Sequence, residues 1–336
     1  MSKTKNQETR LMKHAIAVAA AFCAAVFSNP SAQAAGDPAK LPDLTKIVVP
    51  FSPGASNDVF GRALAAKLAK KLGGNFIVEN RPGAGGAIGA SEVARAAPDG
   101  STLLFSSVSF VTNAATEQKL PYDAVKSFQP VAVAARGAML LVVGNETPYT
   151  SAAQLIADAK KQSGKLTYGS AGVGSIGQMS AELLNAEAGS NMVHVPYKGI
   201  TNAVTDMIGG RLHAMITTPA SVSGPLDAKK IRPLAVTSLQ RSPFYPDLPT
   251  VAETVPGYSV DVWWGVYAPA GTPKPLVDKL NAAIREVSAE PEMRALFARE
   301  ATEPSDMDTA QTTAYVNGEL LKWRKLAADR HIVASQ

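Results

Sequence analysis

The chain has 336 residues, with 33 Lys and Arg against 28 Asp and Glu, and a single cysteine, Cys23. Its basic residues form no run of the kind that binds nucleic acid, and one cysteine excludes a disulfide framework or a Cys-based metal site. The length is sufficient for two domains, each with its own core.

The first 34 residues have the pattern of a secretory signal peptide. Four basic residues precede an apolar stretch over residues 15–27, which is too short to span a bilayer, and Ala32-Gln33-Ala34 is a small-x-small cleavage site. Cleavage after Ala34 leaves 29 basic and 27 acidic residues, a net charge of +2, and removes Cys23. We therefore expect an exported, soluble, cysteine-free protein.

The loop Pro50–Asp58 follows a predicted strand at residues 46–49 and precedes a helix predicted over residues 59–72. Gly54 and Ala55 leave its backbone open to close approach, and three residues can cap the helix: Ser56, Asn57 and Asp58. Free N–H groups at a helix N-terminus favour anions. We hypothesise that this loop holds one carboxylate of a small acid; the alternative is an ordinary strand-to-helix turn.

Strands and helices continue to alternate, with strands at residues 76–78 and 102–105 and a helix at residues 88–97. This alternation predicts a parallel sheet with helices on its faces, in which ligands bind beyond the carboxyl ends of the strands. Ser106 and Ser107 end the third strand, so they are candidates for the same ligand site as the opening loop.

A second domain is predicted to begin at Arg136-Gly137, between apolar segments at residues 131–135 and 139–143. Further strands and helices alternate up to a strand at residues 231–237. The chain then returns to the first domain through a buried strand, a helix that Thr272-Pro273 begins, and a closing helix. In chain order from residue 151, the elements predicted by residue range are 151–161, 166–168, 176–188, 192–195, 202–208, 213–216, 263–267 and 309–328.

Residues 172–177 match the dinucleotide pattern G-x-G-x-x-G, between a predicted strand and a predicted helix. The strand that follows ends in Pro196-Tyr197-Lys198 and offers no acid to hold a ribose. A second carboxylate cradle and a purely structural turn remain equally compatible with this loop. If it is a cradle, Ser170 and Ser175 would add hydroxyl donors to it.

Catalytic and metal-binding patterns are poorly supported. The nucleophile-elbow pattern is absent around Ser175, and the remaining histidines, His194, His213 and His331, show no metal spacing. Asp58 as a general base is less favoured than Asp58 as a helix cap. No cofactor and no metal are therefore expected.

Two cations and two tryptophans have less defined assignments. Lys198 and Arg136 are each compatible with pairing to a ligand carboxylate, although a solvated surface charge is the simpler interpretation. Trp263 and Trp264, in an apolar strand, are most simply core residues, and one of them is a candidate to line a pocket.

Seven motifs occur in an order that resembles a known family, the periplasmic solute receptors of tripartite tricarboxylate transporters, also called Bug-type binding proteins. They cover essentially the whole mature chain. The motifs are Pro50-Phe51-x-Pro53-Gly54-x-x-x-Asp58-x-x-x-Arg62, Val78–Gly86, Ala97–Leu104, His194–Gly199, Leu234–Ser238, Pro249–Glu253 and Ala268–Pro273.

The resemblance implies a non-enzymatic receptor with an α/β fold. This is the two-lobed class II periplasmic binding protein (Venus flytrap), each lobe a mostly parallel sheet flanked by helices. Residues 35–136 and 239–336 would form lobe 1 and residues 137–238 lobe 2, with hinges near 136–138 and 237–239. It implies periplasmic binding of a small organic carboxylate by a monomer and delivery to a two-subunit membrane permease. The expected ligand-binding residues are Phe51, Ser52, Gly54, Ala55, Ser56, Asn57, Asp58, Ser106, Ser107, Ser170, Ala171, Gly172, Gly174, Ser175, Gln178, Tyr197 and Thr217.

Three departures from the family pattern bear on the ligand. Ala55 replaces a usual Gly, Gln178 replaces a usual His, and the acids common near His213 and Thr217 are absent. Because an ammonium group would then lack a partner, we expect a plain dicarboxylate or aromatic carboxylate in preference to an amino acid. Two other functions remain open: an orphan receptor that presents the acid to a sensor protein, and a periplasmic hydrolase on the same scaffold.

Overall fold

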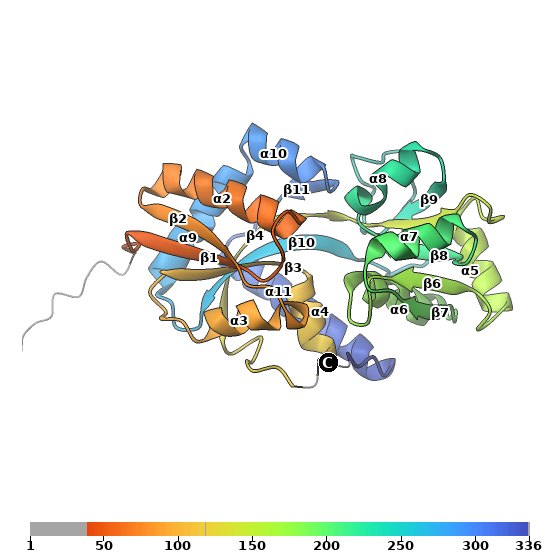
Figure 1. Cartoon of the computed structure of the whole chain (residues 1–336), viewed down its shortest axis with the longest axis horizontal. Helices are drawn as coiled ribbons and strands as arrows, with labels where there is room; N and C mark the ends of the chain where they lie inside the picture. The colour runs from red at the N-terminus through yellow and green to blue at the C-terminus, as the bar shows by residue number, and fades with distance from the viewer. Residues whose placement is uncertain (1–38, 118, 335–336) are drawn as a thin grey trace, which may run out of the picture. The chain divides into compact units, whose positions relative to one another are not determined.

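Two β-sheets, each flanked by helices, make up the chain in the computed structural model (Figure 1). The structure describes residues 39–117 and 119–334; the predicted signal peptide lies outside these residues. Within them, no helix is both long enough and apolar enough to cross a membrane.

The first sheet has six strands in the order β11-β4-β10-β3-β1-β2. Its strands are β1 (Leu44–Val49), β2 (Asn75–Asn80), β3 (Thr102–Ser107), β4 (Phe128–Ala138), β10 (Asp261–Pro269) and β11 (Thr302–Pro304). The helices that accompany them are α2 (Ser56–Leu72), α3 (Ala87–Ala94), α4 (Ser109–Thr116), α9 (Lys274–Ser288), α10 (Pro291–Ala298) and α11 (Thr309–Asp329), with a 3₁₀ turn η1 (Ala84–Gly86).

The second sheet has five strands in the order β7-β6-β8-β5-β9. Its strands are β5 (Leu140–Gly144), β6 (Thr167–Ser170), β7 (Val193–Pro196), β8 (Ala214–Thr217) and β9 (Ile231–Val236). The connecting helices are α5 (Ala152–Lys161), α6 (Ile176–Ala188), α7 (Ile200–Ile208) and α8 (Pro219–Asp227), and a 3₁₀ turn η2 (Val251–Glu253) follows on the return to the first sheet.

Both sheets are more mixed than the mostly parallel arrangement that was predicted. In the first sheet β1 pairs in parallel with β2 and β3, but β10 is antiparallel to both β3 and β4. In the second, β6 is parallel to β7 and β8, and β5 is antiparallel to β8 and β9. In each sheet one of the two strands at the crossings, β10 in the first and β5 in the second, runs against its neighbours on both sides.

Apolar residues on both faces of β1 are fully buried, which is typical of a strand covered by helices on each side. α2 packs there through Leu64 and Leu68, two positions on one helix face. α11 covers the other face near β10, where Trp323 is fully buried. The carboxyl ends of β1 and β3, from which the candidate loops lead, are thus held in a rigid frame.

The chain crosses between the sheets twice, from β4 to β5 and from β9 back to β10. Thr237, which is fully buried, joins the two crossings. Its hydroxyl accepts a hydrogen bond from Met139 N (2.8 Å) and donates one to Val260 O (2.8 Å), and Thr237 N donates to Met139 O (3.0 Å). These bonds bring the two segments predicted as hinges side by side.

Candidate functional site

The first candidate loop begins α2 one turn earlier than predicted. Ala55 is the N-cap residue of α2 and makes no side-chain capping bond. The predicted cap Asp58 instead lies inside the first turn and accepts a hydrogen bond from Gly54 N (2.9 Å). Gly54 has a φ of 87°, a left-handed conformation that favours glycine. The carboxylate of Asp58 therefore fixes the loop from within.

Asp58 is buried and has three kinds of donor around it. Besides Gly54 N, it accepts from Asn80 Nδ2 (2.9 Å) and pairs with Arg62 Nε (2.9 Å). Burial opposes ionisation, but these hydrogen bonds outweigh it, so the pKa of Asp58 lies below its ordinary value. A carboxylate engaged in this way positions the loop, and a role as a general base is not supported.

The rest of the first loop is accessible. Ser52, Gly54 and Ala55 are exposed, and Phe51 and Ser56 are partly buried.

At the end of β3, Ser106 and Ser107 are both buried. The Ser107 hydroxyl donates to Ser109 Oγ (3.1 Å), at the start of α4.

The second candidate loop is held by its own hydroxyl and amide groups. Ser175 caps α6 by accepting from Gln178 N (3.4 Å) and donates to Gly172 O (2.7 Å). The side-chain oxygen of Gln178 accepts from Gly174 N (2.7 Å). Gly172 and Gly174 have φ values of 118° and 78°, so both need glycine. Ala171 is exposed at the tip of this loop.

Ser170 and His194 form a pair that sequence reasoning missed, with Oγ 2.6 Å from the ring Nε2. The Ser170 side chain is fully buried, and its oxygen also contacts Gly172 N and O at 3.1 Å. Burial lowers the pKa of His194 below its ordinary value. Among the described residues no carboxylate contacts this ring, so the pair supports the loop and does not amount to a catalytic triad.

Other predicted residues lie at the margin of these loops. Thr217 is buried at the end of β8, whereas the Tyr197 hydroxyl donates to Asp206 (2.7 Å) on α7. Lys198 is exposed. His213 Nδ1 accepts from Thr167 N (3.0 Å), which is a packing role.

The second loop contacts the helix that follows β3. A Cβ atom placed on Gly174 would lie 2.7 Å from Thr116 Oγ1, at the end of α4. The Thr116 carbonyl in turn accepts from Ala334 N (3.1 Å). The glycine loop of the second sheet therefore packs directly on an element of the first.

Glu300, which follows α10, makes a second contact of this kind and was not predicted. Its carboxylate accepts a hydrogen bond from the Ser56 hydroxyl in the first turn of α2. The side chain of Thr218, the N-cap residue of α8, lies close enough to help lower the pKa of Glu300. The N-termini of α2 and α8 thus both lie near an acid that is 244 residues from Ser56.

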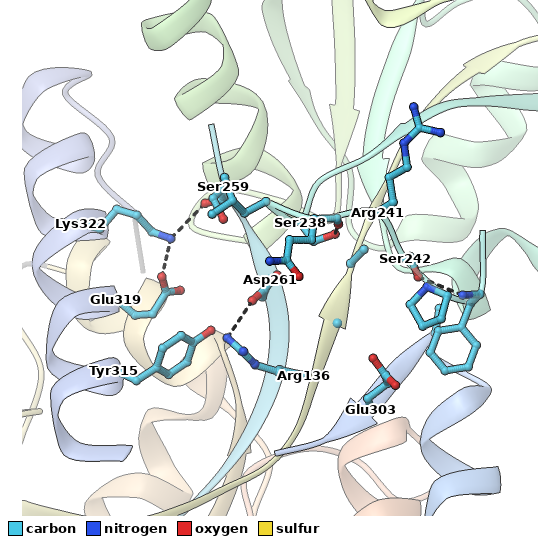
Figure 2. A pocket seen from close by; sticks show the side chains of 17 residues that line it. Arg136, Ser238, Arg241, Ser242, Ser259, Asp261, Glu303, Tyr315, Glu319 and Lys322 are labelled. Carbon is cyan, nitrogen blue, oxygen red and sulfur yellow. Dashed lines mark hydrogen bonds and ion pairs between the residues drawn. The ribbon is translucent and has the colours of Figure 1, made fainter. Parts of the chain in front are cut away.

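The described residues also form a polar cavity of about 380 Å³ at the crossings between the sheets (Figure 2). Neither candidate loop lines it. Arg136 of β4 forms an ion pair with Asp261 of β10, with 3.6 Å between Nη1 and Oδ2. Its predicted alternative role as a partner of a ligand carboxylate is therefore not supported. Burial raises the pKa of Asp261 to about 6; the charge of Arg136 opposes this effect and that of Glu319 adds to it.

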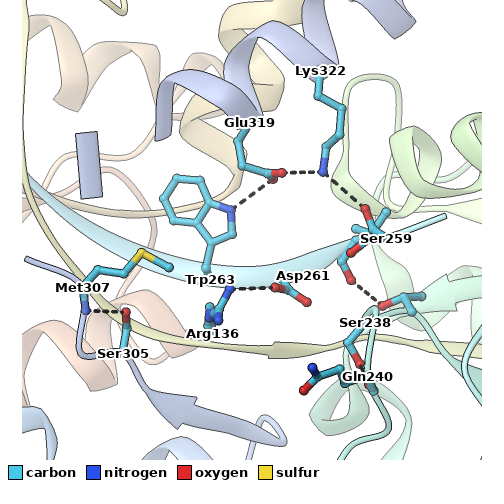
Figure 3. Close-up of polar contacts among 12 residues, drawn as sticks. Arg136, Ser238, Gln240, Ser259, Asp261, Trp263, Ser305, Met307, Glu319 and Lys322 are labelled. Atoms are coloured by element: carbon cyan, nitrogen blue, oxygen red, sulfur yellow. Dashed lines mark hydrogen bonds and ion pairs between the residues drawn. The ribbon is translucent and has the colours of Figure 1, made fainter. Parts of the chain in front are cut away.

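A second set of contacts beside this cavity attaches α11 to β10 (Figure 3). Glu319 accepts from the indoles of Trp263 (3.3 Å) and Trp323 (3.2 Å) and pairs with Lys322, whose ammonium also donates to Ser259 O (3.4 Å). Trp263 is therefore a core residue, as the simpler interpretation predicted. No group of three His, Cys, Asp or Glu side chains within residues 39–117 and 119–334 is arranged to hold a metal ion.

Sequence comparison identifies a family whose description is "Tripartite tricarboxylate transporter family receptor", matched over residues 60–332. A UPF0065 protein from the tcbD-tcbE intergenic region of Pseudomonas sp. (strain P51) is 37% identical over 296 residues, which is 86% of this chain and 87% of that protein. Protein BugT of Bordetella pertussis is 32% identical over 281 residues, covering 83% of this chain and 86% of BugT.

Solved structures of similar proteins share the fold over nearly their whole length. Rpa4515 of R. palustris with adipate is 35% identical with a TM-score of 0.74, covering 86% of this chain and 98% of that one. MatC of Rhodopseudomonas palustris with bound malate is 30% identical with a TM-score of 0.70, covering 84% and 98%. The periplasmic binding protein BugD is 30% identical with a TM-score of 0.70, and the match covers 87% of this chain and 98% of that one. The two-lobed periplasmic binding fold predicted from the sequence is confirmed.

Proposed function

Because this chain belongs to the tripartite tricarboxylate transporter receptor family, we propose that it binds a small organic carboxylate in the periplasm and delivers it to a two-subunit membrane permease. The family consists of solute-binding receptors. The proposed ligand is a dicarboxylate or aromatic carboxylate, and the proposed working form is a monomer whose lobes, residues 35–136 with 239–336 and residues 137–238, close around it.

The observation that carries the proposal is the pair of loops that begin α2 and α6. Each follows the carboxyl end of a parallel strand, and each opens a helix whose first N–H groups have no partner within the helix. The main-chain amides and the helix dipoles together favour negative oxygens. One carboxylate would meet the loop at residues 50–58 and another the loop at residues 170–178.

Contacts between the two halves support a site between these loops. Gly174 packs on Thr116, and Glu300 accepts a hydrogen bond from Ser56 and lies close to Thr218, so the α6 loop and the α2 loop each come near the opposite sheet. The exposed residues of the loops, Ser52, Gly54, Ala55 and Ala171, are then free to contact a ligand. The remaining candidates act in this proposal by holding the two backbones in place.

A thermal-shift screen against aliphatic, aromatic and hydroxy acids tests the proposal. A ligand at 1,000 times its Kd stabilises the folded chain by about 4 kcal/mol, which gives a large rise in Tm. We expect at least one acid to produce such a rise and a neutral amide of the same acid to produce none. If no acid in the screen raises the Tm, carboxylate binding is wrong.

Delivery to a permease is tested by uptake. Cells that express a two-subunit permease of this transporter family should accumulate the radiolabelled acid only when this receptor is present. A receptor that binds the acid without supporting uptake would point to the sensor alternative.

A further inference from the structure

Glu300 is an acid buried beside the proposed ligand site. Only 6% of its surface is exposed. One carboxylate oxygen accepts from the Ser56 hydroxyl at the start of α2, and the Thr218 side chain at the start of α8 lies close to the carboxylate. The side chain therefore lies where both helix N-termini meet, and Ser56 is itself one of the predicted ligand contacts.

The other carboxylate oxygen, Oε2, is buried and has no hydrogen-bond partner among the described residues. A buried acceptor without a donor is costly, and such atoms in folded proteins are expected to meet water, a ligand or another group. Glu300 also forms no ion pair with a cation among the described residues, and no cation contributes to its pKa. Glu300 Oε2 is thus a buried acceptor that a donor group on a ligand can reach without displacing a protein partner.

Two more unpartnered polar atoms lie around the first turns of α2. Asn57 Oδ1 is in the first turn, and the indole Nε1 belongs to Trp264, whose ring packs against Phe60 at 4.8 Å between centroids. Trp264 is 3% exposed. With Glu300, these atoms offer two acceptors and one donor. A bare carboxylate can use the indole donor but neither of the two acceptors.

Charge repulsion disfavours an ionised ligand carboxylate beside an ionised Glu300. Burial raises the pKa of Glu300, and the nearby Ser56 and Thr218 only partly offset this effect, so the environment also disfavours the charge of Glu300 itself. A ligand carboxylate at neutral pH is ionised and has no proton to donate. A hydroxyl or an ammonium group can donate to Oε2, and an ammonium group also supplies the missing positive charge.

We propose that Glu300 makes the receptor selective for acids that carry a hydroxyl or ammonium group next to a carboxylate. This inference rests on the proposed carboxylate-binding function and specifies its ligand class. The sequence-based preference for a plain diacid assumed that no acid lay near Thr217; Glu300, which lies close to Thr218, supplies one from a distant part of the chain.

Calorimetric titration with acids that differ at a single carbon tests the proposal. The probes are succinate, malate and aspartate, and the C5 series glutarate, 2-hydroxyglutarate and glutamate, each at pH 7.5. In the series that fits the site, we expect the wild-type chain to bind a substituted acid at least tenfold more tightly than the plain diacid. Glu300→Gln keeps the shape but removes the charge, and it should reduce this preference below threefold, mainly by weakening the substituted acid.

Glu303→Gln is the matched control, because it makes the same change three residues away, at the wall of the polar cavity at the crossings and outside the two loops. It should keep the wild-type preference. Circular dichroism and thermal unfolding of the ligand-free variants verify folding, and Glu300→Gln should unfold no earlier than the wild type, since it relieves a buried charge.

Three results would overturn the inference, and they are distinguishable. Plain diacids that bind as tightly as their substituted partners remove the selectivity while leaving carboxylate binding intact. An unchanged preference in Glu300→Gln assigns the selectivity to another group. Absence of binding by all acids in the thermal-shift screen removes the proposed function and this inference with it.

Discussion

At the scale of single residues, several side chains near the proposed site act on the loops and leave ligand contact to the backbone. Asp58 accepts from Gly54, Asn80 and Arg62, and Gln178 accepts from Gly174. The motif residues of both loops therefore hold main-chain amides in a fixed direction. Fixed donors need no reordering when an anion binds, which reduces the entropic cost of binding.

Asp58→Asn should lower the free energy of unfolding by about 1–3 kcal/mol at pH 7, since it removes charge-assisted hydrogen bonds from a buried group. The pKa of Asp58 is depressed in the folded chain, so its stabilising effect is present above the unfolded value of 3.8 and is lost as pH falls through the folded value. Urea unfolding at pH 7 and pH 3 should show the wild-type advantage shrinking at the lower pH. Asp306→Asn, at an exposed aspartate without a hydrogen bond to described residues, should have little effect at either pH.

Gly174→Ala should destabilise the chain for two reasons, a strained φ of 78° and a Cβ atom 2.7 Å from Thr116 Oγ1. The strain costs about 1–2 kcal/mol, and displacing the neighbour adds about 1–3 kcal/mol. Gly189→Ala, at the other end of α6, has a φ of 63° and open space around it, so it should show the strain alone. Equal losses for the two variants in urea unfolding would contradict the contact between the α6 loop and α4.

At the scale of elements, strand β10 lies in the middle of the first sheet and lines the polar cavity at the crossings between the sheets. It lies between β3 and β4, carries Asp261, which forms an ion pair with Arg136 of β4, and is attached to α11 through Trp263 and Glu319. A charged pair beside the crossing makes the stability of this region dependent on pH.

Asp261→Asn should stabilise the chain at neutral pH. The folded pKa of about 6 is above the unfolded value of 3.8, so the folded chain binds more protons between about pH 4 and 6, and stability falls as pH rises through that window. The shift corresponds to at most about 3 kcal/mol. Urea unfolding should show the variant and the wild type nearly equal at pH 4 and the variant more stable at pH 7. A less stable variant at pH 7 would mean that the attraction of Arg136 outweighs the cost of burial.

Elements with strong periodicity and clear caps were predicted well from the sequence. α6 was predicted over its observed range, and α11 differs by one residue. α8 was missed because it contains Pro225, and the three-residue strand β11 carries too little pattern to detect. The two glycine loops are local motifs and were therefore visible, whereas Glu300 joins the site only through tertiary packing, which no local pattern reports.

At the scale of the whole molecule, the described chain crosses between the two sheets twice, and Thr237 bonds to both crossings. The hinge segments predicted from the sequence, residues 136–138 and 237–239, include this residue. Hinge closure around a ligand requires these crossings to bend together. The hydroxyl of Thr237 couples them.

Thr237→Val keeps the shape of the side chain but leaves Met139 N–H and Val260 C=O without that partner. We expect a loss of about 2 kcal/mol in the free energy of unfolding, because both groups are buried. Scanning calorimetry should also show a broader transition, since the two halves are less tightly coupled. Thr313→Val is the control, as that hydroxyl bonds only within its own helix, to Thr309 O (2.8 Å); a similar loss there would show that the effect is not specific to the crossings.

The position of β10 in the first sheet determines the order in which the two sheets can form during synthesis. β3 and β4 are made early, but their common neighbour β10 ends only at Pro269, and the helix that covers it ends at Asp329. During vectorial synthesis the first sheet stays incomplete, whereas the second sheet, with strands from Leu140 to Val236, already has all of its strands. The first sheet can therefore be completed only when nearly the whole chain has been synthesised.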